Sequence, residues 1–183
     1  MEIVGERVML RDFCQEDIED HIRWNTVFTE WKEWDTPWQQ NVVFDAEEYR
    51  RKQQQRCRET LSQGRMRYSL EIELLGESHS HIGFCNVYTI GKNYEPTEKE
   101  IDYCIGIDIP EKKYRKNGYG KDAFQLYINY LNEQGIRDVY TQTWSGNKAM
   151  IALAQSLSFS LCQRKNDVYQ KDGVSYDYMT FVR

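Results

Sequence analysis

The segment 109–124, IPEKKYRKNGYGKDAF, constrains the fold of this chain more than any other. Gly118 and Gly120 follow the cationic run 115–117 and precede a stretch with the apolar spacing of a helix. A helix N-terminus presents free N–H groups and a positive dipole end, and glycine lets an anion approach the main chain. A tight turn at Asn117–Gly118, with lysines for solubility, explains these residues equally well. The segment alone leaves both interpretations open.

Strand and helix patterns along the chain predict a mixed α/β fold in a single domain, residues 1–183. The predicted strands are 6–13, 66–74, 81–90, 99–109 and 139–144, followed by a hairpin at 168–182 with its turn at Asp172–Gly173. The predicted helices are 16–24, about 45–61, 120–135 and 147–157. In the third helix Ala123, Phe124, Tyr127 and Leu131 share one face, and Gly135 is the expected stop.

Composition narrows the classes of partner and compartment. The 183-residue chain carries a net charge of -5, which argues against a general electrostatic grip on nucleic acid. It has no apolar run near the roughly 20 residues of a membrane span. Five scattered cysteines without a CxxC pair indicate reduced thiols in the cytoplasm. Neither the cysteines nor the three histidines show metal-ligand spacing, so we expect no metal.

Two motifs resemble the GNAT N-acetyltransferase superfamily. Arg-x-x-Gly-x-Gly at 115–120 matches the pyrophosphate-binding signature of that family, between its fourth strand and third helix. The segment TWSGNKAMIALAQSLSF, 143–159, is similar to the strand and asparagine-headed helix that follow. The resemblance runs from GERVMLRDF to SYDYMTFV and is greatest to the branch of ribosomal-protein-alanine acetyltransferases.

The resemblance implies a GNAT fold that binds acetyl-CoA. This fold has a central mixed, mostly antiparallel twisted sheet flanked by helices, with a V-shaped split between strands 4 and 5. The pantetheine amides would pair with the main chain of strand 4, and the pyrophosphate would bind the glycine loop. The implied coenzyme residues are Ile107, Asp108, Ile109, Arg115, Lys116, Asn117, Gly118, Tyr119, Gly120, Lys121 and Asn147. Asn147 also suits a plain helix N-cap, so both roles remain open.

The catalytic residues of the family are less well matched. The glutamate that many members place on strand 4 corresponds to Cys104, which is a poor base. Strand alternation puts Glu100 and Asp102 on the same face, so either is a candidate base, or else an ordinary solvated acid. The tyrosine that serves many members as general acid corresponds to Ala154, and a usual glycine to Ser158. The acid stays unassigned.

The family places the acceptor between the first two helices and the last hairpin. Acidic and aromatic residues gather in those segments and would suit a cationic amine through charge pairing and cation–π contact. The candidate acceptor residues are Trp31, Trp34, Glu33 and Tyr176. Tryptophans three or four residues apart on a short helix are equally typical of core anchors, and this alternative stays open.

The leading hypothesis is an acetyl-CoA-dependent N-acetyltransferase. Its acceptor would be a primary amine, in a peptide N-terminus or in a polyamine or aminoglycoside-like molecule. The altered positions Cys104 and Ala154 motivate an alternative, a non-catalytic acetyl-CoA-binding sensor or regulatory module. The basic run 50–58 is expected to be a solvated helix face, so we expect neither a nucleic-acid nor a membrane partner. A homodimer is an expectation from the family only.

Overall fold

The computed structural model of the chain describes residues 1–35, 37–38, 43–58, 65–76, 80–99 and 102–183. The strands within them are β1 (Glu2–Val4), β2 (Val8–Arg11), β3 (Ser69–Leu74), β4 (His81–Ile90), β5 (Asp102–Asp108), β6 (Val139–Trp144), β7 (Ser160–Lys171) and β8 (Val174–Val182). The helices are α1 (Asp17–Thr26), α2 (Lys32–Asp35), α3 (Ala46–Arg58), α4 (Tyr119–Glu133) and α5 (Lys148–Ser156), with the short 3-10 helices η1 (Thr29–Trp31) and η2 (Lys112–Tyr114). None of these helices is both long and apolar enough to cross a membrane.

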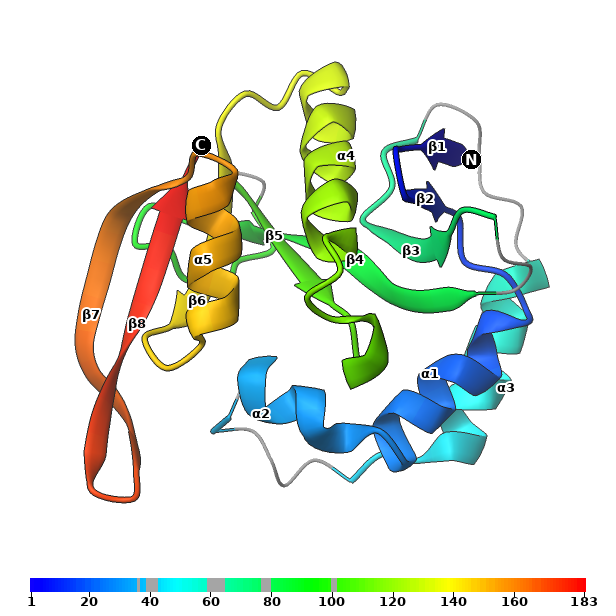
Figure 1. Ribbon diagram of the computed structural model, residues 1–183, viewed down its shortest axis with the longest axis horizontal. Coiled ribbons are helices and arrows are strands. Elements are labelled where there is room, and N and C mark those ends of the chain that lie inside the picture. Colours follow the sequence, from blue (N-terminus) through cyan, green and yellow to red (C-terminus); the bar gives the residue numbers. More distant parts are fainter. Residues whose placement is uncertain (36, 39–42, 59–64, 77–79, 100–101) are drawn as a thin grey trace.

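The strands form one eight-stranded sheet in the order β1-β2-β3-β4-β5-β6-β8-β7. All neighbouring strands are antiparallel except β5 and β6, which are parallel and are connected through helix α4. Figure 1 shows α4 and α5 next to each other over the middle of the sheet, with α1, α2 and α3 gathered below them in the view. The predicted mixed, mostly antiparallel sheet flanked by helices is confirmed.

Strands β5 and β6 separate soon after they begin, which confirms the predicted V-shaped split. Their pairing consists of Tyr103 with Val139 and Cys104 with Tyr140. One further hydrogen bond joins them, from Thr141 Oγ1 to Ile105 O at 2.8 Å. Strand β5 then continues beside β4 as far as Asp108, while β6 follows β8. The split therefore opens toward the carboxyl ends of both strands.

Helix α4 packs on the sheet through the face that its sequence predicts. The four apolar residues of that face are all fully buried: Ala123, Phe124, Tyr127 and Leu131. They belong to one hydrophobic core with the inward side chains of the central strands, such as Leu10 and Ile105. Full burial of a side chain such as Phe124, Leu131, Leu10 or Ile105 contributes about 1.5–3 kcal/mol relative to exposure. Gly135, with φ of +89°, follows the end of the helix, as predicted for its stop.

Several predicted bounds change near the N-terminus. The strand predicted at 6–13 is the shorter β2, and the prediction missed β1, which a turn with a hydrogen bond from Gly5 N to Val8 O at 2.9 Å joins to it. The helix predicted at about 45–61 is α3 as far as Arg58, and its remaining predicted residues lie outside the described part of the chain. The predictions for 81–90 and 139–144 are confirmed without change as β4 and β6.

The C-terminal hairpin is longer than predicted. Its turn is confirmed, because Asp172 and Gly173 have positive φ angles of 53° and 77°, as in the turns that match strand twist. Strand β7 nevertheless begins at Ser160, so the prediction missed 160–167. This edge strand is mostly exposed, and two register shifts interrupt its pairing with β8. An exposed edge needs no apolar alternation, which is why the pattern gave no signal.

Candidate active site at the split

The glycine loop, residues 115–120, connects η2 to helix α4 at the open end of the split. Lys116 and Gly118 have positive φ angles of 63° and 84°, and α4 begins at Tyr119. None of the backbone N–H groups from Lys116 to Gly120 donates a hydrogen bond to another described residue. Free N–H groups at the positive end of a helix dipole form an anion site. The loop can therefore hold a group such as a pyrophosphate.

Arg7 and Asp122 hold this loop against the sheet. Arg7 Nη1 donates to Asn117 O at 2.7 Å, a contact between residues 110 positions apart. The main-chain N–H groups of Arg7 and Val8 donate to Asp122 Oδ2 at 2.7 and 3.1 Å. Asp122, in the first turn of α4, therefore fixes the start of this helix to the start of β2. Arg7 also adds a cation beside Gly118 that sequence reasoning missed, since nothing in the loop sequence signals it.

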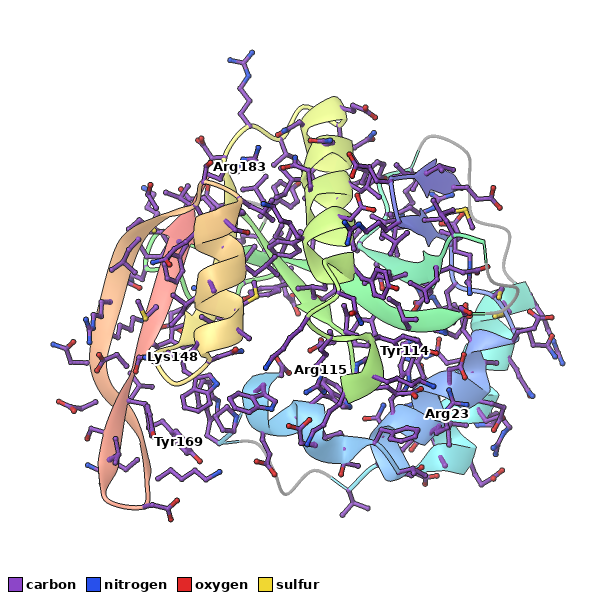
Figure 2. The ribbon with its side chains drawn as sticks, in the orientation of Figure 1. Arg23, Tyr114, Arg115, Lys148, Tyr169 and Arg183 are labelled. Atoms are coloured by element: carbon purple, nitrogen blue, oxygen red, sulfur yellow. The ribbon has the colours of Figure 1, made fainter. Side chains whose placement is uncertain are left out.

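The three predicted cations of the loop have different surroundings. Lys116 and Lys121 are exposed and form no ion pair with another described residue. The guanidinium of Arg115 has three acceptors: Ile109 O at 2.8 Å, Pro110 O at 2.6 Å and Glu30 Oε2 at 2.8 Å. Figure 2 shows Arg115 between the lower end of α4 and helix α2. Its side chain ties the loop to the end of β5 and to η1, which leaves the two lysines as the uncommitted loop cations.

The predicted coenzyme-pairing residues lie at the open end of β5. Ile107 and Asp108 pair with β4 on one side, and no described strand pairs with their other edge. A Cβ added at Gly120 would lie 3.5 Å from Ile109 Cδ1 and 3.8 Å from Ile107 Cδ1. The glycine loop therefore sits directly against this strand end. Free N–H groups and a free strand edge follow one another along the same wall of the split.

Helix α2 connects the two walls of the split. Trp34 O accepts hydrogen bonds from Trp144 Nε1 at 2.8 Å and from Asn147 Nδ2 at 2.9 Å. Glu30, in the preceding η1, binds Arg115 of the glycine loop. Residues 29–35 are thus fixed to β6 and α5 on one side and to the glycine loop on the other. We call this segment the α2 bridge.

Asn147 contributes two hydrogen bonds to this region. Its Oδ1 accepts from Met150 N at 3.0 Å, so the predicted N-cap of α5 is confirmed. Its Nδ2 donates to Trp34 of the α2 bridge. The predicted contact of Asn147 with the pantetheine arm stays a prediction.

We expect the substitution Asn147→Asp to loosen the α2 bridge while keeping the helix cap. Aspartate retains the cap acceptor but loses the donor to Trp34 O, a hydrogen bond of about 1 kcal/mol. Hydrogen exchange in 29–35 should accelerate while exchange in α5 stays close to wild type. In Asn147→Ala both segments should exchange faster, because cap and cross-link are both lost. Unchanged exchange of 29–35 in Asn147→Asp would contradict the bridging role.

A hydroxyl network covers the closed end of the split on the face opposite α4. Tyr88 Oη and Tyr178 Oη donate to Gln142 Oε1 at 2.9 and 3.1 Å, and Cys104 Sγ lies 3.1 Å from Tyr88 Oη. Burial raises the pKa of Cys104 to about 12, so its thiol stays protonated. Gln142 Nε2 donates to Thr180 Oγ1 at 3.0 Å and so has a fixed orientation. Sequence reasoning missed this network because its members come from four different strands.

Of the two predicted catalytic acids, the structure describes Asp102 but not Glu100. Asp102 pairs with Ile90 at the start of β5, before the parallel pairs that close the split. Asp108, predicted only as a main-chain contact, lies at the open end. Burial raises the pKa of its carboxyl group well above the ordinary value, the charge of Asp35 raises it further, and Arg115 opposes them.

Two of the four candidate acceptor residues contact Trp144. Trp34 is 42% exposed and its carbonyl binds Trp144, while Tyr176 meets the Trp144 ring edge-on at 4.9 Å. Trp31 points inward, with its Nε1 donating to Trp24 O at 2.9 Å. Glu33 is exposed and lies 3.9 Å from Lys171 of the hairpin. Figure 2 shows Tyr169 of β7 on the same side, between the hairpin and α2. Acidic and aromatic groups therefore do meet beside the split.

A separate ionic cluster lies between α1 and the sheet. Glu71 Oε2 lies 3.0 Å from His21 Nε2 and 2.9 Å from His81 Nε2. His81 Nδ1 lies 3.0 Å from Asp20 Oδ2 and 3.2 Å from Asp17 Oδ1. Its members come from α1, β3 and β4, so sequence spacing gave no sign of it. The cluster shares no residue with the split and fixes α1 to the sheet.

Comparison with known proteins agrees with this geometry. Residues 7–160 match the family model described as Acetyltransferase (GNAT) domain. An acetyltransferase of the GNAT family from Bacillus anthracis has a TM-score of 0.71 and 17% identity, with 100% of this chain and 98% of that chain covered. A RimL ribosomal L7/L12 alpha-N-protein acetyltransferase in complex with coenzyme A has a TM-score of 0.71 and 17% identity, with 100% and 97% covered. A ribosomal-protein-alanine N-acetyltransferase from Brucella melitensis has a TM-score of 0.62 and 17% identity, with 95% and 98% covered.

No curated protein sequence matches the chain. At 17% identity the solved structures show that the fold is shared. The family model shows more than the shared fold, because it matches most of the chain, including the glycine loop, the split and Asn147. The chain belongs to the GNAT acetyltransferase family.

Proposed function

We propose that the chain transfers the acetyl group of acetyl-CoA to a primary amine, by direct attack of the amine nitrogen on the thioester. One observation carries this proposal. The free N–H groups of 116–120 lead directly to the free main-chain edge of Ile107 and Asp108. The first suits a pyrophosphate and the second suits the amides of a pantetheine arm.

The residues of the glycine loop would share the work of holding the coenzyme. Gly118, Tyr119 and Gly120 would offer main-chain N–H groups to the pyrophosphate, together with Lys116 and Asn117. Lys116 and Lys121 would add charge-assisted contacts, since neither has another ionic partner among the described residues. Arg115 would position the loop through Ile109 and Pro110. Asn147 would face the pantetheine arm once acetyl-CoA occupies the split.

The acceptor proposed here is a cationic primary amine, as in a peptide N-terminus, a polyamine or an aminoglycoside. Asp108 and Asp35 bring two carboxyl groups to the open end of the split. Trp34 and Trp38 are 42% and 40% exposed beside them, on and just after the α2 bridge. Carboxylates and exposed indole faces together favour an ammonium group over a neutral or anionic acceptor. We also expect a cytoplasmic location, in line with five free cysteines.

Release of free thiol from acetyl-CoA tests the proposal. The wild-type chain should release thiol with at least one member of a panel containing N-terminal peptides, polyamines and aminoglycosides. Mass spectrometry should show an acetyl group on the amine. Calorimetric titration with acetyl-CoA serves as the binding control. Binding without any thiol release would contradict the enzyme, and no binding at all would contradict the coenzyme site.

A non-catalytic acetyl-CoA sensor is the second candidate. Two observations favour it: the thiol of Cys104 stands where many members carry a glutamate, and the buried Ala154 stands where they carry a tyrosine. The thiol assay separates the two candidates, because a sensor binds acetyl-CoA and is stabilised by it without consuming it.

A further inference from the structure

The thioester sulfur needs a proton when it leaves as coenzyme A thiol, and α5 offers no donor for it. Ala154 is fully buried and packs in the hydrophobic core with Phe124 and Phe159. The methyl side chain of Ala154 has no hydroxyl to donate. The donor must come from another element that reaches the split.

The hydroxyl network at the closed end of the split contains such a group. Tyr178, on β8, stands opposite Trp144 of β6, and its hydroxyl reaches Gln142 Oε1 at 3.1 Å. Gln142 is level with Gly106 when the parallel pairing of β5 and β6 is continued beyond Cys104 and Tyr140. Gly106 has no side chain, and a Cβ there would lie 2.5 Å from Asn86 Oδ1, so the Asn86 amide lies over the main chain at this level. The network therefore lies where the acetyl end of a pantetheine arm that passes Asp108 and Ile107 would arrive.

Tyr178 differs from Tyr88, the other phenol of the network. Tyr88 is committed twice, since it donates to Gln142 and accepts the thiol hydrogen of Cys104. The Tyr178 hydroxyl donates to Gln142 and also contacts the Tyr88 hydroxyl, and the side chain is half-buried, with the ring of Trp38 edge-on at 6.0 Å. Burial raises the pKa of Tyr178 to about 12, and a hydrogen bond from Tyr88 acts in the opposite direction. Burial raises the pKa of Tyr88 further, so Tyr178 is the more acidic phenol.

We propose that Tyr178 is the general acid that donates a proton to the coenzyme sulfur, with Tyr88 stabilising the phenolate left behind. This inference rests on the proposed acetyl transfer. The amine nitrogen forms a bond to the acetyl carbon, the C–S bond breaks, and its electron pair stays on sulfur. The sulfur takes the Tyr178 proton, and the proton lost by the amine nitrogen returns through water to the phenolate. Charge and atoms balance, with the amide and the free thiol as products.

Several charged and titratable groups face Tyr178 and enter its pH dependence. Tyr88 and Cys104 face it from β4 and β5, Asp35 from the α2 bridge and Glu95 from the segment after β4. Lys165 is its pairing partner on β7 and binds Glu95. The acids raise the pKa of Tyr178, so the phenol stays protonated near neutral pH and is available as a donor.

Tyr178→Phe tests the proposal, with Tyr140→Phe as matched control on the same face of the neighbouring strand β6. Each variant loses one phenolic hydroxyl and keeps its aromatic ring. We expect Tyr178→Phe to lower kcat by about 100-fold or more, the usual contribution of a general acid, with an acetyl-CoA Kd within twofold of wild type. The decline of kcat at high pH in the wild type should be absent from this variant. Tyr140→Phe should keep kcat within about threefold, and Tyr88→Phe should fall between them.

Each other outcome has a definite meaning. A kcat of Tyr178→Phe within threefold of wild type overturns the role of Tyr178 and leaves acetyl transfer standing. Loss of acetyl-CoA binding or of cooperative unfolding in Tyr178→Phe, with Tyr140→Phe normal, shows a structural role and also overturns it. If wild type binds acetyl-CoA but releases no thiol with any amine, acetyl transfer itself fails and the inference fails with it.

Discussion

Replacing His81 with leucine is expected to destabilise the fold by about 3–5 kcal/mol, the usual cost of removing one partner from a buried ion pair. The His81 side chain is 3% exposed and stands between the carboxylates of Glu71 and Asp17, each 2% exposed. Asp17 keeps Arg11 as a bidentate partner after the substitution, at 2.7 Å through both nitrogens. Among the residues that the structure describes, Glu71 keeps only His21 as a side-chain partner. Its buried carboxylate would then lack most of its compensation.

Urea unfolding at pH 6.5 measures this loss, and His21→Gln is the control. His21 contacts the same Glu71 oxygen, but it has no contact with Asp17 or Asp20, and glutamine can still donate a hydrogen bond. We expect the control to cost about 1 kcal/mol. Equal losses in the two variants would show that the cluster acts through packing alone and that the charge of His81 is unimportant.

The same histidine makes stability depend on pH in a defined direction. Burial alone lowers the pKa of His81, but hydrogen bonds to Asp20 and Glu71 and the charges of Glu71 and Asp17 raise it from 6.5 to about 9. The unfolded chain releases this proton near 6.5 and the folded chain near 9. The stabilisation is therefore complete below pH 6.5 and is lost as pH rises toward 9, on the order of 3 kcal/mol in all. His81→Leu should remove this dependence.

The features that could be predicted from the sequence are those in which neighbours along the chain determine the structure. The buried face of α4 follows from four apolar residues at helical spacing, and the N-cap of α5 follows from Asn147. The positive φ of Gly118 agrees with the turn that the Asn117–Gly118 pair predicts. Strand alternation correctly separated Cys104, which faces Tyr88, from the core residue Ile105.

The features that could not be predicted depend on residues far apart in the chain. Arg7 reaches the glycine loop across 110 positions, and Trp144 reaches Trp34 across the same distance. Tyr178 joins Gln142 across 36 positions because β6 and β8 are adjacent in the sheet. No local pattern records such pairings. The tryptophan cluster shows the same limit, because Trp24 is fully buried whereas Trp34 is 42% exposed, although both lie on short helices.

Replacing Gly118 with valine is expected to weaken acetyl-CoA binding by tenfold or more. Gly118 has φ of +84°, a region that costs a β-branched residue about 1–3 kcal/mol. A Cβ there would lie 2.9 Å from Arg7 Nη1, the atom that holds the loop through Asn117 O. The added side chain therefore displaces both the loop and its anchor. The free N–H groups from Lys116 to Gly120 would no longer converge on one anion.

Gly135→Val separates this effect from backbone strain. Gly135 ends the same helix with φ of +89°, and a Cβ there meets nothing within 4 Å, so its valine incurs a similar strain far from the loop. Calorimetric titration should give a Kd for acetyl-CoA close to wild type in Gly135→Val and tenfold or more weaker in Gly118→Val. Both variants should lose similar thermal stability without ligand. A Gly118→Val protein that binds acetyl-CoA as tightly as wild type would show that the pyrophosphate does not bind this loop, because the added side chain would block an anion from the main chain there.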